Sequence, residues 1–259
     1  MANPWNPSCR IYLTGEVAVE AEQDLLRRND FPSPQALLAF VFLVAGRRGS
    51  ITADHMATAL WPDGGRPRAW DSAMSAILSK VRSLLQRRLP RAELDISRRL
   101  GRVRLDLPTN TWVDIEVAAS AIDEAEGHWR ARRIQAAWAA ANVAACIARD
   151  PVLAEHESAW LEAIRSRLCA ITVRALRTLS DISLVNGEGD LAVLHAQQLL
   201  ELEPLRETSY SQLMRVYAAL GDRGAALRVY ARCRERLLDE LGTSPSAETE
   251  AVYLSILRA

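Results

Sequence analysis

The stretch WDSAMSAILSKVRSLLQR, residues 70–87, has the periodicity of an amphipathic helix. Its apolar side chains recur at alternating steps of four and three and form one stripe: Trp70, Met74, Ile77, Val81 and Leu84, with Leu78 and Leu85 beside it. The opposite face is small, polar and basic: Ser72, Ser75, Ser79, Arg82 and Gln86, flanked by Lys80, Ser83 and Arg87. We expect the stripe to face a core. The polar face could approach a phosphate backbone, although most faces of this kind are solvated surface.

The segments on either side favour an approach to a phosphate backbone over plain solvated surface. Residues 52–61 are predicted to form a short helix, with Thr52 as its N-cap and Asp54 in its first turn. Residues 94–107 are predicted to form a basic hairpin. The order helix, turn, helix and hairpin is typical of a winged helix-turn-helix, in which the second helix enters the DNA major groove.

The charge is unevenly distributed, although the whole chain carries 32 basic and 32 acidic residues. Residues 1–107 contain 16 Lys and Arg against 11 Asp and Glu, and the remaining residues contain 16 against 21. Within residues 47–104 the counts are 13 and 5, a net charge of +8. An excess of this size in a small module is expected where a protein meets phosphates.

Two further segments near the predicted recognition helix carry arginines. The loop PDGGRPR, residues 62–68, is too long and too rich in Pro and Gly for a three-residue turn. It is either a connector or a surface that faces DNA or another protein through Asp63, Arg66 and Arg68. The hairpin concentrates guanidinium groups near its tip, where they suit phosphates and a narrow minor groove alike: Arg98, Arg99, Arg102 and Arg104.

Several classes of protein are disfavoured by composition and motif. The longest uncharged apolar run, residues 36–45, is too short to span a bilayer, so we expect a soluble cytoplasmic protein. The cysteines, Cys9, Cys146, Cys169 and Cys233, lack C-x-x-C spacing, and we expect reduced core residues rather than a zinc site. The four histidines are isolated and no catalytic motif occurs, so we expect neither an enzyme nor a bound cofactor or metal.

The predicted fold is mainly α, with a winged helix-turn-helix followed by an all-α domain. Residues 1–9 are expected to be loose and residues 10–108 to form the winged module, with short strands near 11–13 and 17–19. A buried helix should begin after Ser33 and stop at Gly46. Residues 113–259 should form the helical domain.

This helical domain contains a repeat with a period of 34 residues. Leu176, Leu179, Gly187, Ala192, Ala196 and Leu199 recur as Tyr210, Leu213, Gly221, Ala226, Tyr230 and Cys233. The period and the order of large, small and breaker residues are those of tetratricopeptide repeats. These side chains are expected to pack in the core, while the array as a whole favours protein or peptide binding.

Five motifs together resemble the SARP (Streptomyces antibiotic regulatory protein) family of actinobacterial regulators. They are ALWPD (59–63), SKVR before LL (79–85), LDLP (105–108), WVD (112–114) and ELGTSPS (240–246). The resemblance implies an OmpR-type winged helix followed by a bacterial transcriptional activator domain. Where the family usually has Gly-Tyr in the last wing strand, this chain has Gly101-Arg102. Larger relatives append a nucleotide-binding domain; no G-x-x-x-x-G-K-[ST] motif occurs here, so we expect the small form.

The function implied by this resemblance is sequence-specific activation of transcription. Such a protein binds direct repeats in double-stranded DNA near promoters, as a homodimer or side-by-side pair, and contacts RNA polymerase and its sigma factor. It would be associated with the nucleoid and not with a membrane. The alternative is a helical adaptor whose winged module binds protein. The net charge of +8 over residues 47–104 favours DNA.

Overall fold

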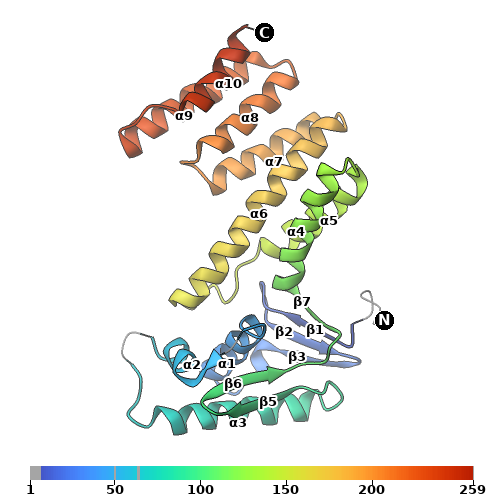
Figure 1. Ribbon diagram of the computed structural model, residues 1–259, viewed down its shortest axis with the longest axis vertical. Helices are drawn as coiled ribbons and strands as arrows, with labels where there is room; N and C mark the ends of the chain where they lie inside the picture. The colour runs from blue at the N-terminus through green and yellow to red at the C-terminus, as the bar shows by residue number, and fades with distance from the viewer. Residues whose placement is uncertain (1–6, 50, 63–64, 259) are drawn as a thin grey trace. The chain divides into compact units, whose positions relative to one another are not determined.

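The computed structural model describes residues 7–49, 51–62 and 65–258, which divide into two compact units. The winged unit extends to Val117 and also includes Ile147–Leu168. The helical unit comprises Ala118–Cys146 and the chain from Cys169 onward. Among the described residues the fold is mainly α, and the strands belong to the winged unit (Figure 1), which confirms the predicted fold class.

Three helices form the core of the winged unit: α1 (Pro34–Ala45), α2 (Ala53–Leu60) and α3 (Trp70–Arg88). Helix α1 begins as predicted, because Ser33 Oγ accepts a hydrogen bond from Ala36 N at 3.2 Å. Thr52 caps α2 in the same way, accepting from His55 N at 3.1 Å. Helix α1 is buried along most of its length and packs against both α2 and α3.

Two small sheets complete this unit: β1 (Cys9–Tyr12), β2 (Ala18–Ala21), β3 (Asp24–Arg27), β4 (Ile51–Thr52), β5 (Asp95–Arg99), β6 (Arg102–Asp106) and β7 (Thr111–Val113), with a 3-10 turn, η1 (Arg28–Asp30). Their orders are β3-β2-β1-β7 and β4-β6-β5. The leading pair of strands and the β5–β6 hairpin confirm the predictions. Strand β1 begins at Cys9, the last residue of the segment expected to be loose. Strands β3, β4 and β7 were not predicted, because strands this short are determined by their partners rather than by their own pattern.

A buried carboxylate joins β1 to the start of α4 (Asp114–Arg130). Strand β7 pairs in parallel with β1, and this brings Asp114 beside the end of β1. Its Oδ2 accepts hydrogen bonds from Leu13 N at 2.7 Å and from Thr14 N and Thr14 Oγ1 at 2.8 Å, and its Oδ1 accepts from Ile115 N at 2.7 Å. Burial raises the pKa of Asp114, and these hydrogen bonds partly oppose that rise.

The start of α4 is also tied to the end of α1 by an ion pair. Arg47 donates to the Glu116 carboxylate through Nε, at 2.6 Å, and through Nη2, at 2.7 Å, and Arg48 Nη2 lies 2.7 Å from the same carboxylate. Burial raises the pKa of Glu116, but the hydrogen bonds from the two arginines outweigh it and hold the pKa below its ordinary value. The first turn of α4 is therefore fixed electrostatically to the winged unit.

Residues 147–168 also pack within the winged unit. Gly15 N donates to Pro151 O at 3.1 Å, and the Trp160 indole donates to Ala59 O at 3.3 Å. The Trp160 ring also meets Phe42 edge-on, with ring centroids 5.1 Å apart. Because this segment follows α4 and α5 in the chain, the winged unit is completed by residues that come well after its winged helix-turn-helix.

The remaining helices are α5 (Ile134–Ala148), α6 (Ala159–Val185), α7 (Gly189–Leu202), α8 (Glu207–Ala219), α9 (Arg223–Leu241) and α10 (Ala247–Arg258). The structure confirms the 34-residue repeat between α6–α7 and α8–α9. Gly187 and Gly221 both have positive φ, 77° and 79°, at equivalent helix ends. The next residue of each turn donates to an equivalent carbonyl, Glu188 N to Ser183 O at 2.8 Å and Asp222 N to Tyr217 O at 2.9 Å.

The paired side chains of the repeat are buried, as predicted: Leu176 and Tyr210, Leu179 and Leu213, Ala192 and Ala226, Ala196 and Tyr230, Leu199 and Cys233. Helix α10 closes the array. Tyr230 stacks on Tyr253 with ring centroids 3.9 Å apart, and its hydroxyl donates to Glu250 at 2.6 Å. The closing motif is held by Ser246, whose backbone N and Oγ each donate to Glu207 at 2.8 Å.

The cysteine prediction was wrong for two of the four residues. Cys9 and Cys233 are buried, but Cys146 and Cys169 are exposed. Helix α5 is rich in alanine on several sides, so its apolar pattern does not indicate which side is covered. Among the described residues, no helix is long and apolar enough to cross a membrane.

Replacement of Asp114 by Asn should lower the free energy of unfolding by about 2 kcal/mol. The amide keeps one acceptor oxygen but turns an NH₂ group toward buried N–H donors. Urea denaturation of both proteins checks the effect. Asp150→Asn is the matched control, because the Asp150 side chain is 54% exposed and its contact with Arg149 is long, at 3.8 Å. Equal midpoints for Asp114→Asn and the unmodified protein would contradict this role.

Candidate DNA interface

Helix α3 has the two faces predicted from its sequence. Its apolar stripe is buried at Met74, Leu78, Val81, Leu84 and Leu85, whereas Trp70 and Ile77 are half-buried. The other face exposes Ser72, Ser75, Ser79, Lys80 and Arg87. Strand β5 lies alongside α3 (Figure 1), so the structure brings the predicted recognition helix and the predicted wing together.

Arg82 connects α3 to the wing. Its Nε lies 3.1 Å from Asp95 Oδ1 and donates to Ile96 O at 3.0 Å, and its Nη2 also donates to Ile96 O. The guanidinium is therefore bound to β5 within the protein, although we had expected it to contact phosphate.

Arg98 makes a second connection in the opposite direction. It extends from β5 to α3, where it pairs with Asp71 and donates to Ser75 Oγ at 2.8 Å. The Arg98 guanidinium holds the pKa of Asp71 below its ordinary value. Two arginines thus fix β5 to α3, one from each element. Sequence reasoning missed Asp71 and Asp95 as partners; the signal was present, because few acidic residues occur within the basic segment.

The wing turn exposes a leucine between arginines. Arg99 pairs with Arg102 across the hairpin, and the two residues between them, Leu100 and Gly101, have φ values of 50° and 71°. Two positive φ values in a two-residue loop are the type I′ pattern, which matches the twist of a hairpin. Leu100 is fully exposed and Arg99 is exposed. Arg104 Nε lies 2.7 Å from Asp106 Oδ1 of the same strand, β6.

Of the two arginines before α3, one is half-buried and paired and the other is exposed. Arg66 Nη2 lies 2.7 Å from Asp54 Oδ1. The central carbon of its guanidinium lies 3.6 Å from the centroid of the Trp70 ring, a cation–π contact. Its Nε is buried without a partner among the described atoms. Arg68 is exposed. Asp63, which we expected in the same surface, lies outside the described residues.

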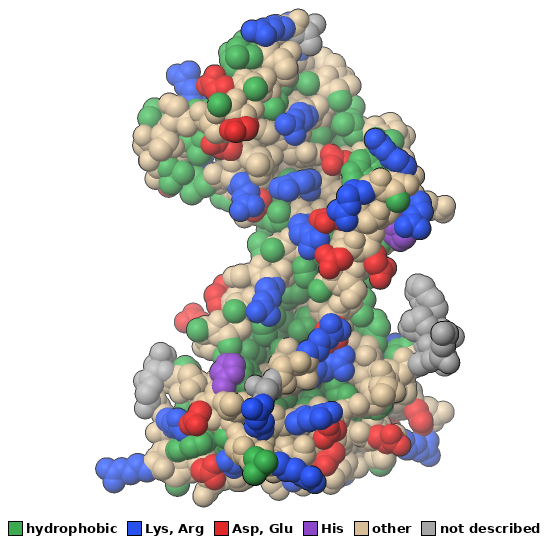
Figure 2. Space-filling view, in the orientation of Figure 1, with side chains coloured by type: hydrophobic (Ala, Val, Ile, Leu, Met, Phe, Trp, Pro, Cys, Tyr) green, Lys and Arg blue, Asp and Glu red, His purple; other side chains and the backbone are tan. Residues whose placement is uncertain are grey.

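Internal pairing uses much of the basic charge of residues 47–104. Within the described part of the chain, these arginines form ion pairs: Arg47, Arg48, Arg66, Arg82, Arg88, Arg91, Arg98 and Arg104. Basic and acidic side chains accordingly mix on the visible face of this unit (Figure 2). Lys80, Arg87, Arg99 and Arg68 are exposed and form no side-chain ion pair with a described residue. Nor is any group of three or more His, Cys, Asp or Glu side chains arranged to hold a metal ion across the described ranges.

Comparison with known proteins identifies the helical part of the chain. The family described as bacterial transcriptional activator domain matches residues 113–257. The chain belongs to this family. The finding confirms the resemblance to SARP-type regulators, and the family and its named relatives are transcriptional regulators rather than enzymes.

Three relatives give the extent of this likeness. The transcriptional regulatory protein MoaR1 of Mycobacterium tuberculosis is 30% identical over 111 residues, which cover 42% of this chain and 36% of MoaR1. The regulatory protein AfsR of Streptomyces coelicolor is 29% identical over 241 residues, covering 88% of this chain and 22% of AfsR. The transcriptional regulatory protein EmbR of Mycobacterium tuberculosis is 24% identical over 234 residues, covering 88% of this chain and 58% of EmbR.

A solved structure supports the fold over nearly the whole chain. Mycobacterium tuberculosis EmbR, in complex with a low-affinity phosphopeptide, matches with a TM-score of 0.84 at 22% identity. The match covers 98% of this chain and 66% of the EmbR chain. At this identity the likeness shows the fold alone, a winged module with a helical domain.

Replacement of Arg82 by Ala should lower the free energy of unfolding by about 1–2 kcal/mol, because Ile96 O loses a charged donor. Hydrogen exchange in β5 should become faster. Urea denaturation and amide exchange measure the two effects. Arg87→Ala is the matched control on the same helix, and it should change stability by less than about 0.5 kcal/mol. If the two variants were equally stable, Arg82 would not be part of the connection between α3 and β5.

Proposed function

We propose that this protein is a sequence-specific DNA-binding activator of transcription of the SARP type. The observation that carries the proposal is the exposed serine face of α3, flanked by Lys80 and Arg87 and accompanied by a basic wing tip. A helix face without bulky side chains can approach base edges closely, and unpaired cations beside it suit phosphates. The family membership of residues 113–257 supports a role in transcription.

The contacts divide by chemistry. Ser72, Ser75 and Ser79 make few strong base contacts, so direct readout through α3 is modest. Lys80 and Arg87 bind phosphates at the edges of the same groove. The wing reaches the neighbouring minor groove with Arg99 and Arg102, where a narrowed groove attracts guanidinium groups and favours A·T-rich flanks. Arg82 and Arg98 act indirectly, by holding β5 on α3.

The helical unit supplies contacts to proteins. Helical repeats present surfaces suited to protein partners, and we assign RNA polymerase and its sigma factor to this role. Binding to direct repeats near promoters, with two molecules side by side, follows from the SARP resemblance. Arg68, an exposed residue shortly before α3, is a further candidate for contact with polymerase or DNA.

The phosphate contacts can be tested through the salt dependence of DNA binding. Lys80→Ala and Arg87→Ala should each weaken binding to specific and random duplexes together. Each should also flatten the slope of log K against log salt concentration by about one unit, because one phosphate contact is lost. Fluorescence anisotropy with the full chain at several salt concentrations measures both quantities.

Arg91→Ala is the matched control for this titration. Arg91 is a 71% exposed arginine of the same unit, 3.3 Å from Glu22 and outside α3 and the wing. Its replacement should leave the slope unchanged. Slopes that do not change in Lys80→Ala and Arg87→Ala would remove these residues from the interface. An equal change of slope in Arg91→Ala would show that general charge attraction, and not contacts at α3, accounts for the binding.

A further inference from the structure

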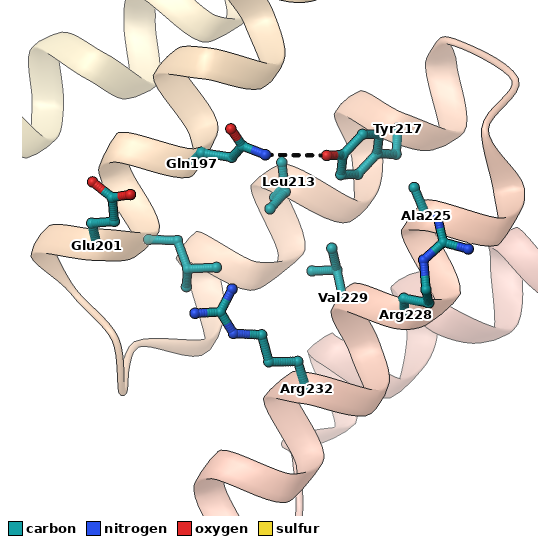
Figure 3. A pocket seen from close by; sticks show the side chains of 9 residues that line it. Gln197, Glu201, Leu213, Tyr217, Ala225, Arg228, Val229 and Arg232 are labelled. Atoms are coloured by element: carbon teal, nitrogen blue, oxygen red, sulfur yellow. Dashed lines mark hydrogen bonds between the residues drawn. The ribbon is translucent and has the colours of Figure 1, made fainter.

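The helical unit contains a groove to which no ligand has been assigned so far. Helices α7 and α9 both pack against α8, and together the three helices line a cavity of about 440 Å³. Its floor is apolar, with Leu213 buried and Val229 half-buried. We call this cavity the α7–α9 groove (Figure 3).

A tyrosine hydroxyl in the groove is available to donate a hydrogen bond. Gln197 of α7 donates through Nε2 to the Tyr217 hydroxyl of α8 at 3.3 Å, as the dashed line in Figure 3 shows. A phenol that accepts one hydrogen bond still carries its own O–H donor. Among the described residues no acceptor is bound to that donor, so a ligand oxygen can take the position.

Two arginines without ion-pair partners among the described residues give the groove an excess of positive charge over the one carboxylate that lines it. Arg228 and Arg232 lie one turn apart on α9, are exposed and form no ion pair with any described residue. Arg236, one turn further along, instead pairs with Glu240 at 3.3 Å. Glu201 of α7 also lines the groove but pairs with neither arginine within the described chain. Like charges four residues apart are mildly destabilising in a helix, and an anionic ligand would remove that cost.

We propose that the α7–α9 groove binds an acidic peptide segment of another protein. Guanidinium groups and the Tyr217 hydroxyl offer donors, and carboxylates are the acceptors that pair with guanidinium most strongly. The apolar floor takes an aliphatic side chain that stands between acidic residues. The proposal assigns a ligand chemistry to the helical unit and does not depend on DNA binding by the winged unit.

The test uses the full chain and two short fluorescein-labelled peptides. One alternates Glu with Leu, and the other has Gln in place of every Glu. The acidic peptide should bind about tenfold more tightly, and the Arg228→Ala/Arg232→Ala variant should lose about tenfold in affinity for it, the loss expected for one or two charge-assisted hydrogen bonds. Arg234→Ala is the matched control, an exposed arginine of α9 outside the groove, and it should bind as the unmodified protein does.

Circular dichroism melting should show that all three proteins keep their helical content. Equal affinity for the two peptides, or an unchanged affinity in the double variant, would overturn the proposal. An equal loss in Arg234→Ala would attribute binding to general charge rather than to the groove. Loss of affinity for duplex DNA without loss of peptide binding would assign Arg228 and Arg232 to phosphates instead.

Discussion

The Asp114 carboxylate is the constraint on which the winged unit depends. It accepts hydrogen bonds from two consecutive backbone N–H groups at the end of β1 and from the first turn of α4. Unpaired buried N–H groups are costly, so the end of β1 and the start of α4 have to stay together. The Arg47–Glu116 ion pair adds a second connection at the same helix start. The start of α4 is therefore part of the core of the winged unit.

Contacts within the protein also determine the surface that we assign to DNA. Arg82 and Arg98 hold α3 and β5 in a fixed arrangement, so the helix and the wing are presented together. This arrangement uses two of the arginines that a count of charge would assign to phosphates. Fewer cations remain exposed without a side-chain ion pair to a described residue. They are Lys80 and Arg87 at the edges of the serine face, Arg99 at the wing tip and Arg68 before α3. A helix and a wing that are held rigidly and offer few DNA contacts are consistent with modest direct readout of the bases.

Most helices and the longer strands of the fold followed from local patterns. The Ser33 and Thr52 caps, the stripe of α3 and the 34-residue repeat are each determined by residues close in the chain. Strand β7 and the roles of Asp114 and Trp160 were not predictable, because their partners lie about a hundred residues away. For the candidate site, the residue types predicted a basic surface but not which guanidinium groups are bound within the protein. Asp71 and Asp95 determine this, because they pair with Arg98 and Arg82. The positive φ of Leu100 likewise depends on the hairpin turn.

Selection of duplexes from a random library by the full chain tests the central claim most directly. Bound duplexes are sequenced, and the enriched site is then footprinted with the unmodified protein and with the Lys80→Ala/Arg87→Ala variant. The account predicts a defined enriched sequence whose backbone is protected over one major groove and the adjacent minor groove, with the protection lost in the variant. If no sequence is enriched, the adaptor interpretation replaces ours. If a site is enriched but its footprint is the same in the variant, the protein does not read DNA through α3, which contradicts the account as well.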